Sequence, residues 1–232
     1  LLWVVAVAVL VLLAAHAIVM AALAKKDLDR PTAEGRRVVR HESIDRIFHW
    51  LMAASIFVLI FTGTAPILGL RIAWLNIHWI SGLLLTFLIA AHIIRSMFWQ
   101  DFKSMLLTPK DFSEPFDSTS KPGKYYFEQK GLHWAATVVV LAVIVTGVLM
   151  FMQIDTPFWE RTNSMPEDQL GLVFLLHGLS TLALVALAST HIYFALRPEK
   201  IFYTRSMLAG WMSEDEMAAN HDPAKWTPKE AD

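Results

Sequence analysis

The sequence predicts an all-α integral membrane protein with five transmembrane helices, and three observations carry the prediction. Hydrophobic residues make up 55% of the 232 residues and charged residues only 18%, which is unlike the composition of a water-soluble domain. Five apolar stretches each reach the roughly 20 residues needed to cross a hydrocarbon core of ~30 Å. Because unpaired strand edges are not tolerated in lipid and barrel strands are shorter, we expect all five to be helices.

The predicted spans cover residues 1–24, 46–66, 74–98, 131–152 and 170–195. Eighteen of the 20 Lys and Arg residues lie within 25–46, 95–130 and 197–232, and only Arg71 and Arg161 lie in the other two loops. Short loops rich in cations stay on the cytoplasmic side. We therefore expect a periplasmic N-terminus and a cytoplasmic C-terminus.

Four parts follow from this topology. They are an extra N-terminal helix at 1–24, a cytoplasmic linker at 25–45, a four-helix domain at 46–195 and a cytoplasmic tail at 196–232. The acidic and then mixed charge after Ser213 predicts a tail that is solvated or contacts a partner. His16 has no ionisable neighbour in the first span, which favours a helix-packing role.

The chain has no cysteine, so a metal must be held by His or carboxylate side chains. The cations lie between apolar stretches instead of forming a basic surface, which excludes nucleic acid as the partner. The nine histidines are therefore the candidates for chemistry.

Histidines recur at a fixed interval in two of the predicted spans. His78 and His92 lie 14 residues apart in the third span, and His177 and His191 lie 14 apart in the fifth. Fourteen helical residues rise about 21 Å and come within about 40° of four whole turns. Both histidines of each pair therefore lie on one helix face, near opposite edges of the bilayer.

The second and fourth spans carry a matching repeat. Each begins with a His-Trp pair, at His49 and His133, and each has a Thr-Gly pair whose glycine follows 14 residues after the histidine, at Gly63 and Gly147. A missing side chain there lets a wide, flat group approach the backbone. Spans two and three thus resemble spans four and five, as a parallel repeat that builds two stacked sites.

The histidine pattern admits three interpretations. Independent interfacial residues have no reason to share one interval with glycines at the matching depth. A zinc or non-haem iron site calls for carboxylates or close His pairs, yet spans two to five hold no acid beyond Asp45 at the edge. Haem needs one axial nitrogen from each of two facing helices and an apolar slot. We favour two haems about 20 Å apart, which would conduct electrons across the membrane.

Specific motifs resemble the cytochrome b, or gamma, subunit of membrane-bound formate dehydrogenases. The resemblance covers residues 38–210 and rests on the run Ile44-Asp45-Arg46-Ile47-Phe48-His49-Trp50, on Gly123-Lys124-Tyr125 with Gln129-Lys130, on Val145-Thr146-Gly147-Val148, and on His177 with His191-Ile192-Tyr193. It implies a quinone-reactive cytochrome of the bacterial inner membrane with two bis-His haems b.

By that resemblance His78 and His177 hold the outer haem, while His49 and His191 hold the inner one. The repeat alone leaves His92 open as the inner ligand in place of His49. The cofactor-contacting residues expected beside them are two glycines at the haem faces and three arginines at the propionates, namely Gly63, Gly147, Arg40, Arg46 and Arg95.

The family reduces menaquinone or ubiquinone beside the inner haem, at the loop before the fourth span. The residues expected there are Tyr126, Glu128, Gln129 and His133. Tyr126 stands where the family often has Asn, and Glu128 where it has Gly, so the donors to the quinone carbonyl differ from the family pattern. Glu128, His133 and Tyr126 are candidates to carry protons from the cytoplasm.

The resemblance also implies an iron-sulfur subunit and a molybdenum or tungsten catalytic subunit on the periplasmic side, because this chain has no cofactor that oxidises a substrate. The chain would then be a quinone-reducing electron-transfer subunit in the lipid bilayer. Three alternatives stay open: a subunit of a hydrogenase or other molybdenum enzyme, a quinol-oxidising cytochrome b, and a haem-free transporter or scaffold with histidine proton relays.

Overall fold

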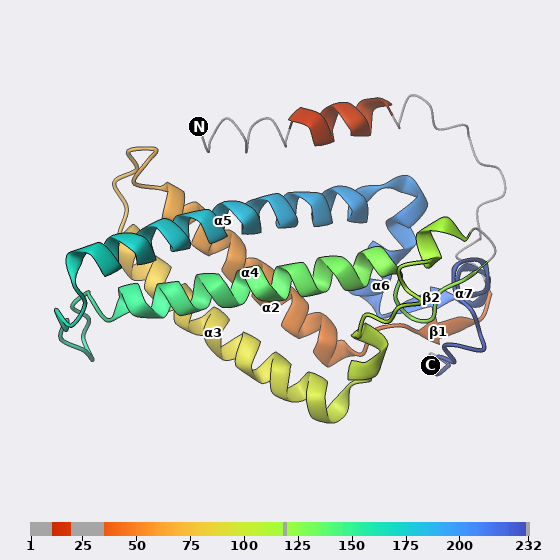
Figure 1. Ribbon diagram of the computed structural model, residues 1–232. Helices are drawn as coiled ribbons and strands as arrows, with labels where there is room; N and C mark the ends of the chain where they lie inside the picture. The colour runs from red at the N-terminus through yellow and green to blue at the C-terminus, as the bar shows by residue number, and fades with distance from the viewer. Residues whose placement is uncertain (1–10, 20–34, 118–119, 231–232) are drawn as a thin grey trace. The chain divides into compact units, whose positions relative to one another are not determined.

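The structure is a computed structural model that describes residues 11–19, 35–117 and 120–230. Within these ranges four helices are long and apolar enough to cross a membrane (Figure 1): α2 (Ser43–Thr64), α3 (Trp74–Trp99), α4 (Phe127–Phe151) and α5 (Glu167–Leu196). All of their ends lie within four residues of the sequence-based bounds. The four helices predicted for these spans are confirmed.

The predicted first span and linker lie largely outside the described residues. Residues 11–19 are helical, whereas 1–10 and 20–34 are not described. His16 Nδ1 forms a hydrogen bond with the hydroxyl of Tyr193, and the two rings meet edge to face. This contact is in keeping with the helix-packing role predicted for His16.

Residues 49–95 and 135–187 form one compact unit, built from parts of α2, α3, α4 and α5. Its buried apolar residues are Ala65, Leu85, Leu88, Val140, Val173 and Leu184. Most other large apolar side chains on these helices point outward, as Phe87 does with 69% of its surface exposed. Such a surface is stable only against an apolar solvent, which fits a helix bundle in a bilayer.

The second compact unit contains the described parts of residues 1–48, 96–134 and 188–232. In it β1 (Arg37–Val39) pairs antiparallel with β2 (Trp211–Ser213), so that Val38 lies opposite Met212. Val38, Met212 and Phe202 of helix α6 (Ile201–Ala209) form its hydrophobic core. Short 3-10 helices occupy 102–105, 114–116 and 198–200.

The sequence around β2 explains where α6 ends and where α7 (Glu214–Asn220) begins. Gly210 terminates α6 in the left-handed region at φ 94°, where its amide donates to the Ser206 carbonyl. Ser213 then caps α7, because its hydroxyl accepts from the Glu216 amide while the Glu216 carboxylate accepts from the Ser213 amide. The buried Glu216 also pairs with Arg205.

The C-terminal tail is in part exposed, as its composition predicted, since Glu214, Asp215 and Lys229 are exposed, and in part packed on its own unit. Met212, Ser213 and His221 are fully buried against the rest of their own unit. Farther along, Val39 donates its amide to the Lys229 carbonyl at 2.8 Å. Part of the polar composition is therefore used for a helix cap and for buried hydrogen bonds within the chain.

Candidate functional site

Two of the predicted ligands, His78 of α3 and His177 of α5, face each other within the first unit. Their ring centres lie 6.3 Å apart, with the ring planes at 71°. A transition metal binds imidazole nitrogen at about 2 Å, and that nitrogen lies about 1 Å from its ring centre, so two rings across one metal have centres about 6 Å apart. The observed spacing therefore suits one metal ion between the two rings.

A threonine on the neighbouring helix holds each of these rings. The Nδ1 atom of His78 lies 2.9 Å from Thr62 Oγ1, and the Nδ1 atom of His177 lies 2.9 Å from Thr146 Oγ1. Both threonines are buried. The two halves of the sequence repeat thus form the same side-chain contact twice.

The threonine hydroxyls determine which nitrogen of each ring carries the proton. Thr62 donates its single proton to the Val58 carbonyl at 2.7 Å, and Thr146 donates to the Ala142 carbonyl at 2.6 Å. Each hydroxyl can then only accept from the histidine, so Nδ1 must bear the proton. The Nε2 lone pair of each neutral ring is left for a metal, as in metal sites where a second contact fixes the tautomer.

The predicted glycines stand against the same two rings. A Cβ atom added at Gly63 would meet His78 Cε1 at 3.4 Å, and one added at Gly147 would meet His177 Cε1 at 3.4 Å. A Cβ there would just make van der Waals contact with the ring, so each glycine lies directly beside its histidine. This twofold arrangement fits the apolar, bis-His slot that haem requires.

Across the described residues, no group of three or more His, Asp and Glu side chains gathers as a chelating metal centre would. His78 and His177 form a pair of neighbouring imidazole rings. Two neutral imidazoles suit haem iron, whose other four ligands come from the porphyrin itself.

The inner ligand set stays a prediction. His49 lies in the second turn of α2, and His191 lies five residues before the end of α5. His92, the alternative inner ligand, lies near the end of α3, and His133, predicted at the quinone, lies near the start of α4. His49 and His133 each pack edge to face on the tryptophan that follows them, which repeats the sequence pattern.

The arginines predicted at haem propionates have partners of their own in the protein. Arg46 donates to the Leu208 carbonyl at the end of α6 and to Ser43 Oγ. Arg40 is buried at 3% exposure and donates to the Lys124 carbonyl at 3.0 Å. Arg95 lies four residues before the end of α3. Arg40 and Arg46 therefore help to build the second unit, whatever else they contact.

The four residues predicted to bind quinone lie in and just before the first two turns of α4. Gln129 Oε1 accepts from the Tyr126 amide at 3.1 Å, which caps the helix. The Tyr126 hydroxyl donates to the Asn220 carbonyl at 2.8 Å, and burial raises its pKa. Glu128 is exposed and His133 is half-buried.

An acid that the sequence analysis did not single out lies beside this helix end. Glu114 Oε1 accepts weakly from the Phe127 amide at 3.4 Å. Burial raises the pKa of the Glu114 carboxyl, and the nearby carboxylates of Glu128 and Asp111 raise it further. Its place in a short 3-10 helix, 13 residues before Phe127, gave no periodic pattern to reveal it.

These features agree with comparison to known proteins. The family described as prokaryotic cytochrome b561 matches residues 40–210. The chain belongs to that family. Membership in this cytochrome b561 family implies haem b, as the histidine pattern predicted.

Two relatives carry the same resemblance. The chain is 27% identical over 213 residues to the formate dehydrogenase cytochrome b556 subunit of Haemophilus influenzae, covering 84% of each chain. It is 25% identical over 213 residues to the formate dehydrogenase cytochrome b556(fdo) subunit of Escherichia coli K12, covering 82% of this chain and 91% of the relative. The predicted family is thereby confirmed.

Sequence reasoning singled out the glycines and missed the role of the threonines beside them. Thr62 and Thr146 were visible as the repeated Thr-Gly pairs. Their spacing from His78 and His177 differs, at 16 and 31 residues, because loops of unequal length join the helices. A search for fixed intervals could not have paired them.

Proposed function

We propose that this chain is the membrane-anchored cytochrome b subunit of a formate dehydrogenase complex and carries electrons through two bis-His haems b to a membrane quinone. The observation that carries the proposal is the repeated threonine-histidine contact around the facing rings of His78 and His177. Family membership and the names of the relatives support the haem and the formate dehydrogenase partner.

His78 and His177 are the proposed axial ligands of the outer haem. Thr62 and Thr146 hold Nδ1 of each ring in a hydrogen bond and so fix its orientation, so that neither ring must rotate when it binds the cofactor. With both histidines as ligands, haem b would supply a one-electron carrier. Such a site favours electron transfer over oxygen chemistry.

His49 and His191 are the proposed ligands of the inner haem, as the family resemblance implies. Both lie near the ends of their helices that adjoin the cation-rich segments. The positive-inside rule assigns that end to the cytoplasm, which makes the C-terminus cytoplasmic in a bacterial inner membrane. An extra N-terminal helix would complete a five-helix protein.

Quinone, either menaquinone or ubiquinone, is proposed to bind where α4 begins. The Gln129 side chain points its oxygen at the Tyr126 amide, so its NH₂ group is the donor that a quinone carbonyl needs. The nearby carboxyls of Glu128 and Glu114 are suited to pass protons from the aqueous side. Electrons would come from an iron-sulfur subunit and a molybdenum or tungsten subunit on the periplasmic side.

The test is purification of the complex through a tag on this chain. We expect two haems b per chain, co-purifying iron-sulfur and molybdenum or tungsten subunits, and formate-dependent reduction of quinone. A preparation without a b-type alpha band would overturn the haem assignment. A preparation that reduces quinone with hydrogen but not with formate would overturn the assignment of the donor.

A further inference from the structure

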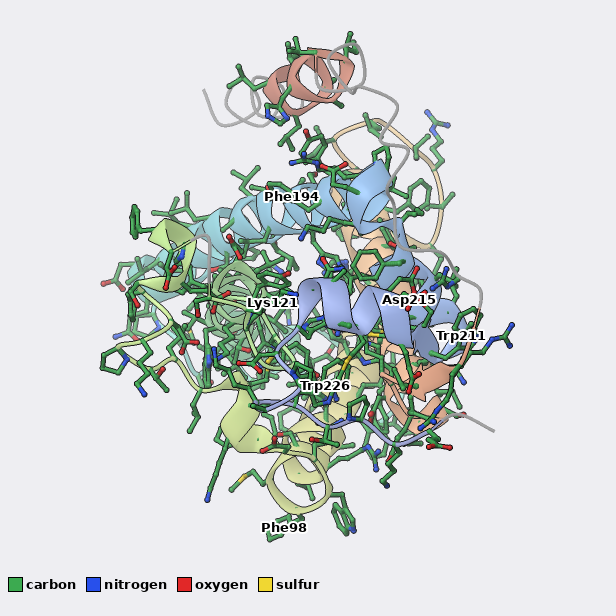
Figure 2. The ribbon with its side chains drawn as sticks, turned by 90° about the vertical axis from the view of Figure 1, so that its right-hand side faces the viewer. Phe98, Lys121, Phe194, Trp211, Asp215 and Trp226 are labelled. Atoms are coloured by element: carbon green, nitrogen blue, oxygen red, sulfur yellow. The ribbon has the colours of Figure 1, made fainter. Side chains whose placement is uncertain are left out.

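The C-terminal segment is hydrogen-bonded to the loop that leads into α4. Residues 218–225 exchange five hydrogen bonds with residues 121–126, and we call this set the tail clamp. Its bonds are Lys121 Nζ to Ala218 O, Lys225 Nζ to Lys121 O, Asp222 N to Pro122 O, His221 Nδ1 to Gly123 O and Tyr126 Oη to Asn220 O. Figure 2 labels Lys121 near one end of α7 and Asp215 near the other.

His221 is the centre of the tail clamp. Its Nε2 atom lies 3.1 Å from an Arg40 nitrogen and 3.0 Å from the Tyr203 hydroxyl. Arginine can only donate, so Nε2 must accept and the proton must sit on Nδ1. Nδ1 then donates to the Gly123 carbonyl at 2.6 Å. A neutral imidazole of one tautomer therefore ties the tail to the loop.

Arg40 completes the arrangement from the side of β1. It is buried, and its guanidinium lies 4.5 Å from the ring centre of Tyr203 and 5.4 Å from that of Trp226. It also donates to the Lys124 carbonyl at 3.0 Å. A buried cation held by rings, a carbonyl and one neutral imidazole depends on each of them, because leaving it unpaired is costly.

We propose that the tail clamp positions the quinone-binding end of α4, and that His221 is its positioning residue. The inference rests on the proposed function, since it concerns the quinone of that site. Fixing residues 123–126 fixes the Tyr126 amide, which in turn orients the Gln129 side chain. His221 touches no reacting group and acts through this loop.

The proposal changes the role of Tyr126 within the site. Its hydroxyl proton is given to the Asn220 carbonyl, so the hydroxyl is a poor donor to a quinone carbonyl. The bulky phenol that stands where the family often has Asn instead fastens the loop to the tail. Hydrogen bonding to quinone then falls to Gln129 and to the acids beside it.

The test compares three variants in the purified complex. His221→Phe keeps a ring but removes all three hydrogen bonds of the imidazole, whereas His221→Gln keeps an oxygen to accept from Arg40 and an NH₂ group to donate to Gly123. Asp215→Asn, on the exposed side of α7, is the matched control. The measurements are KM for a soluble quinone analogue, kcat, the haem spectrum, and amide hydrogen exchange over residues 121–130.

For His221→Phe we expect KM to rise on the order of tenfold with kcat and the haem spectrum little changed, and exchange over 121–130 to accelerate by a similar factor. His221→Gln should restore most of the wild-type KM and exchange rate, and Asp215→Asn should change neither. Tyr126→Phe, which removes a single bond of the clamp, should give a smaller shift of the same kind if His221→Phe does not assemble.

Unchanged amide hydrogen exchange over residues 121–130 in His221→Phe and Tyr126→Phe would show that the tail clamp does not hold this loop. Faster exchange with an unchanged KM would overturn the positioning role. If the wild-type complex contains haem but reduces no quinone, the proposed function fails and the quinone role of His221 fails with it. Exchange over 121–130 distinguishes these results, because it reports on the loop without any turnover.

Discussion

The histidine pair formed by His78 and His177 and the tail clamp around His221 are built in opposite ways. The first is made twice by a repeat, so each ring meets an equivalent threonine and an equivalent glycine. The second is made once, from β1, the loop before α4, α6 and the tail, and its contacts join residues up to 181 positions apart. Repetition suits a site for a nearly symmetrical cofactor, whereas a single asymmetric contact suits one side of a ligand pocket.

The largest expected effect concerns how far the repeat extends to the inner ligands. His49→Leu should remove one of two haems b per chain, because the resemblance assigns His49 as a ligand, and His92→Leu should retain both. The measurement is haem content per chain by the pyridine haemochrome method. Loss of a haem only in His92→Leu would show that the repeat symmetry, and not the family pattern, selects the inner ligands.

The next effect tests the threonines of the histidine pair. Thr62→Val should weaken haem retention by about 10- to 100-fold, the usual cost of losing a contact that orients a metal ligand. Thr64→Val is the matched control, because its hydroxyl likewise donates to a carbonyl four residues back, that of Ile60. The rate of haem transfer to apomyoglobin measures retention. Equal rates in the two variants would contradict the tautomer argument.

The histidine pair and the tail clamp also differ in how much of each could be predicted from the sequence. Four helices were predictable from their long apolar runs, and the pairing of His78 with His177 followed from the repeat between the spans and from the family resemblance. The tail clamp was not, because Arg40, Gly123 and His221 share no interval and each is an ordinary loop residue in the sequence. The acidic start of α7 resembled a solvated end, although it supplies the helix cap.

A smaller effect is expected at the turn that brings β2 back to β1. Gly210→Ala should destabilise the protein by about 1–3 kcal/mol, since φ is positive and the added Cβ would lie 3.1 Å from the His41 carbonyl. Gly69→Ala, also at positive φ but with open space around it, should cost only about 1 kcal/mol. Thermal unfolding in detergent compares the two variants, and an equal loss would rule out the contact with His41.

A pH dependence is also expected in the tail clamp. Burial, with Arg40 and Lys200 nearby, lowers the pKa of His221 from 6.5 to about 4. The other titratable groups facing it, Tyr203 and Tyr126, are neutral, since burial raises the pKa of both.

When the tail is released, His221 becomes protonated below about pH 6.5, whereas in the clamped tail it stays neutral down to about pH 4. The clamp should therefore weaken as pH falls from about 6.5 towards 4 and stay constant above that window. Exchange over residues 121–130, corrected for its intrinsic pH dependence, measures this change. His221→Gln should remove the pH dependence, and its persistence there would assign the effect to another group.

The most direct test of the central claim is the reduced-minus-oxidised optical spectrum of the purified complex with wild-type chain and with His78→Leu. We predict a b-type alpha band in the wild type whose intensity falls by about half in the variant, because one of two bis-His haems loses an axial ligand. A band of unchanged position and intensity in His78→Leu would show that the facing imidazoles of His78 and His177 do not hold the cofactor.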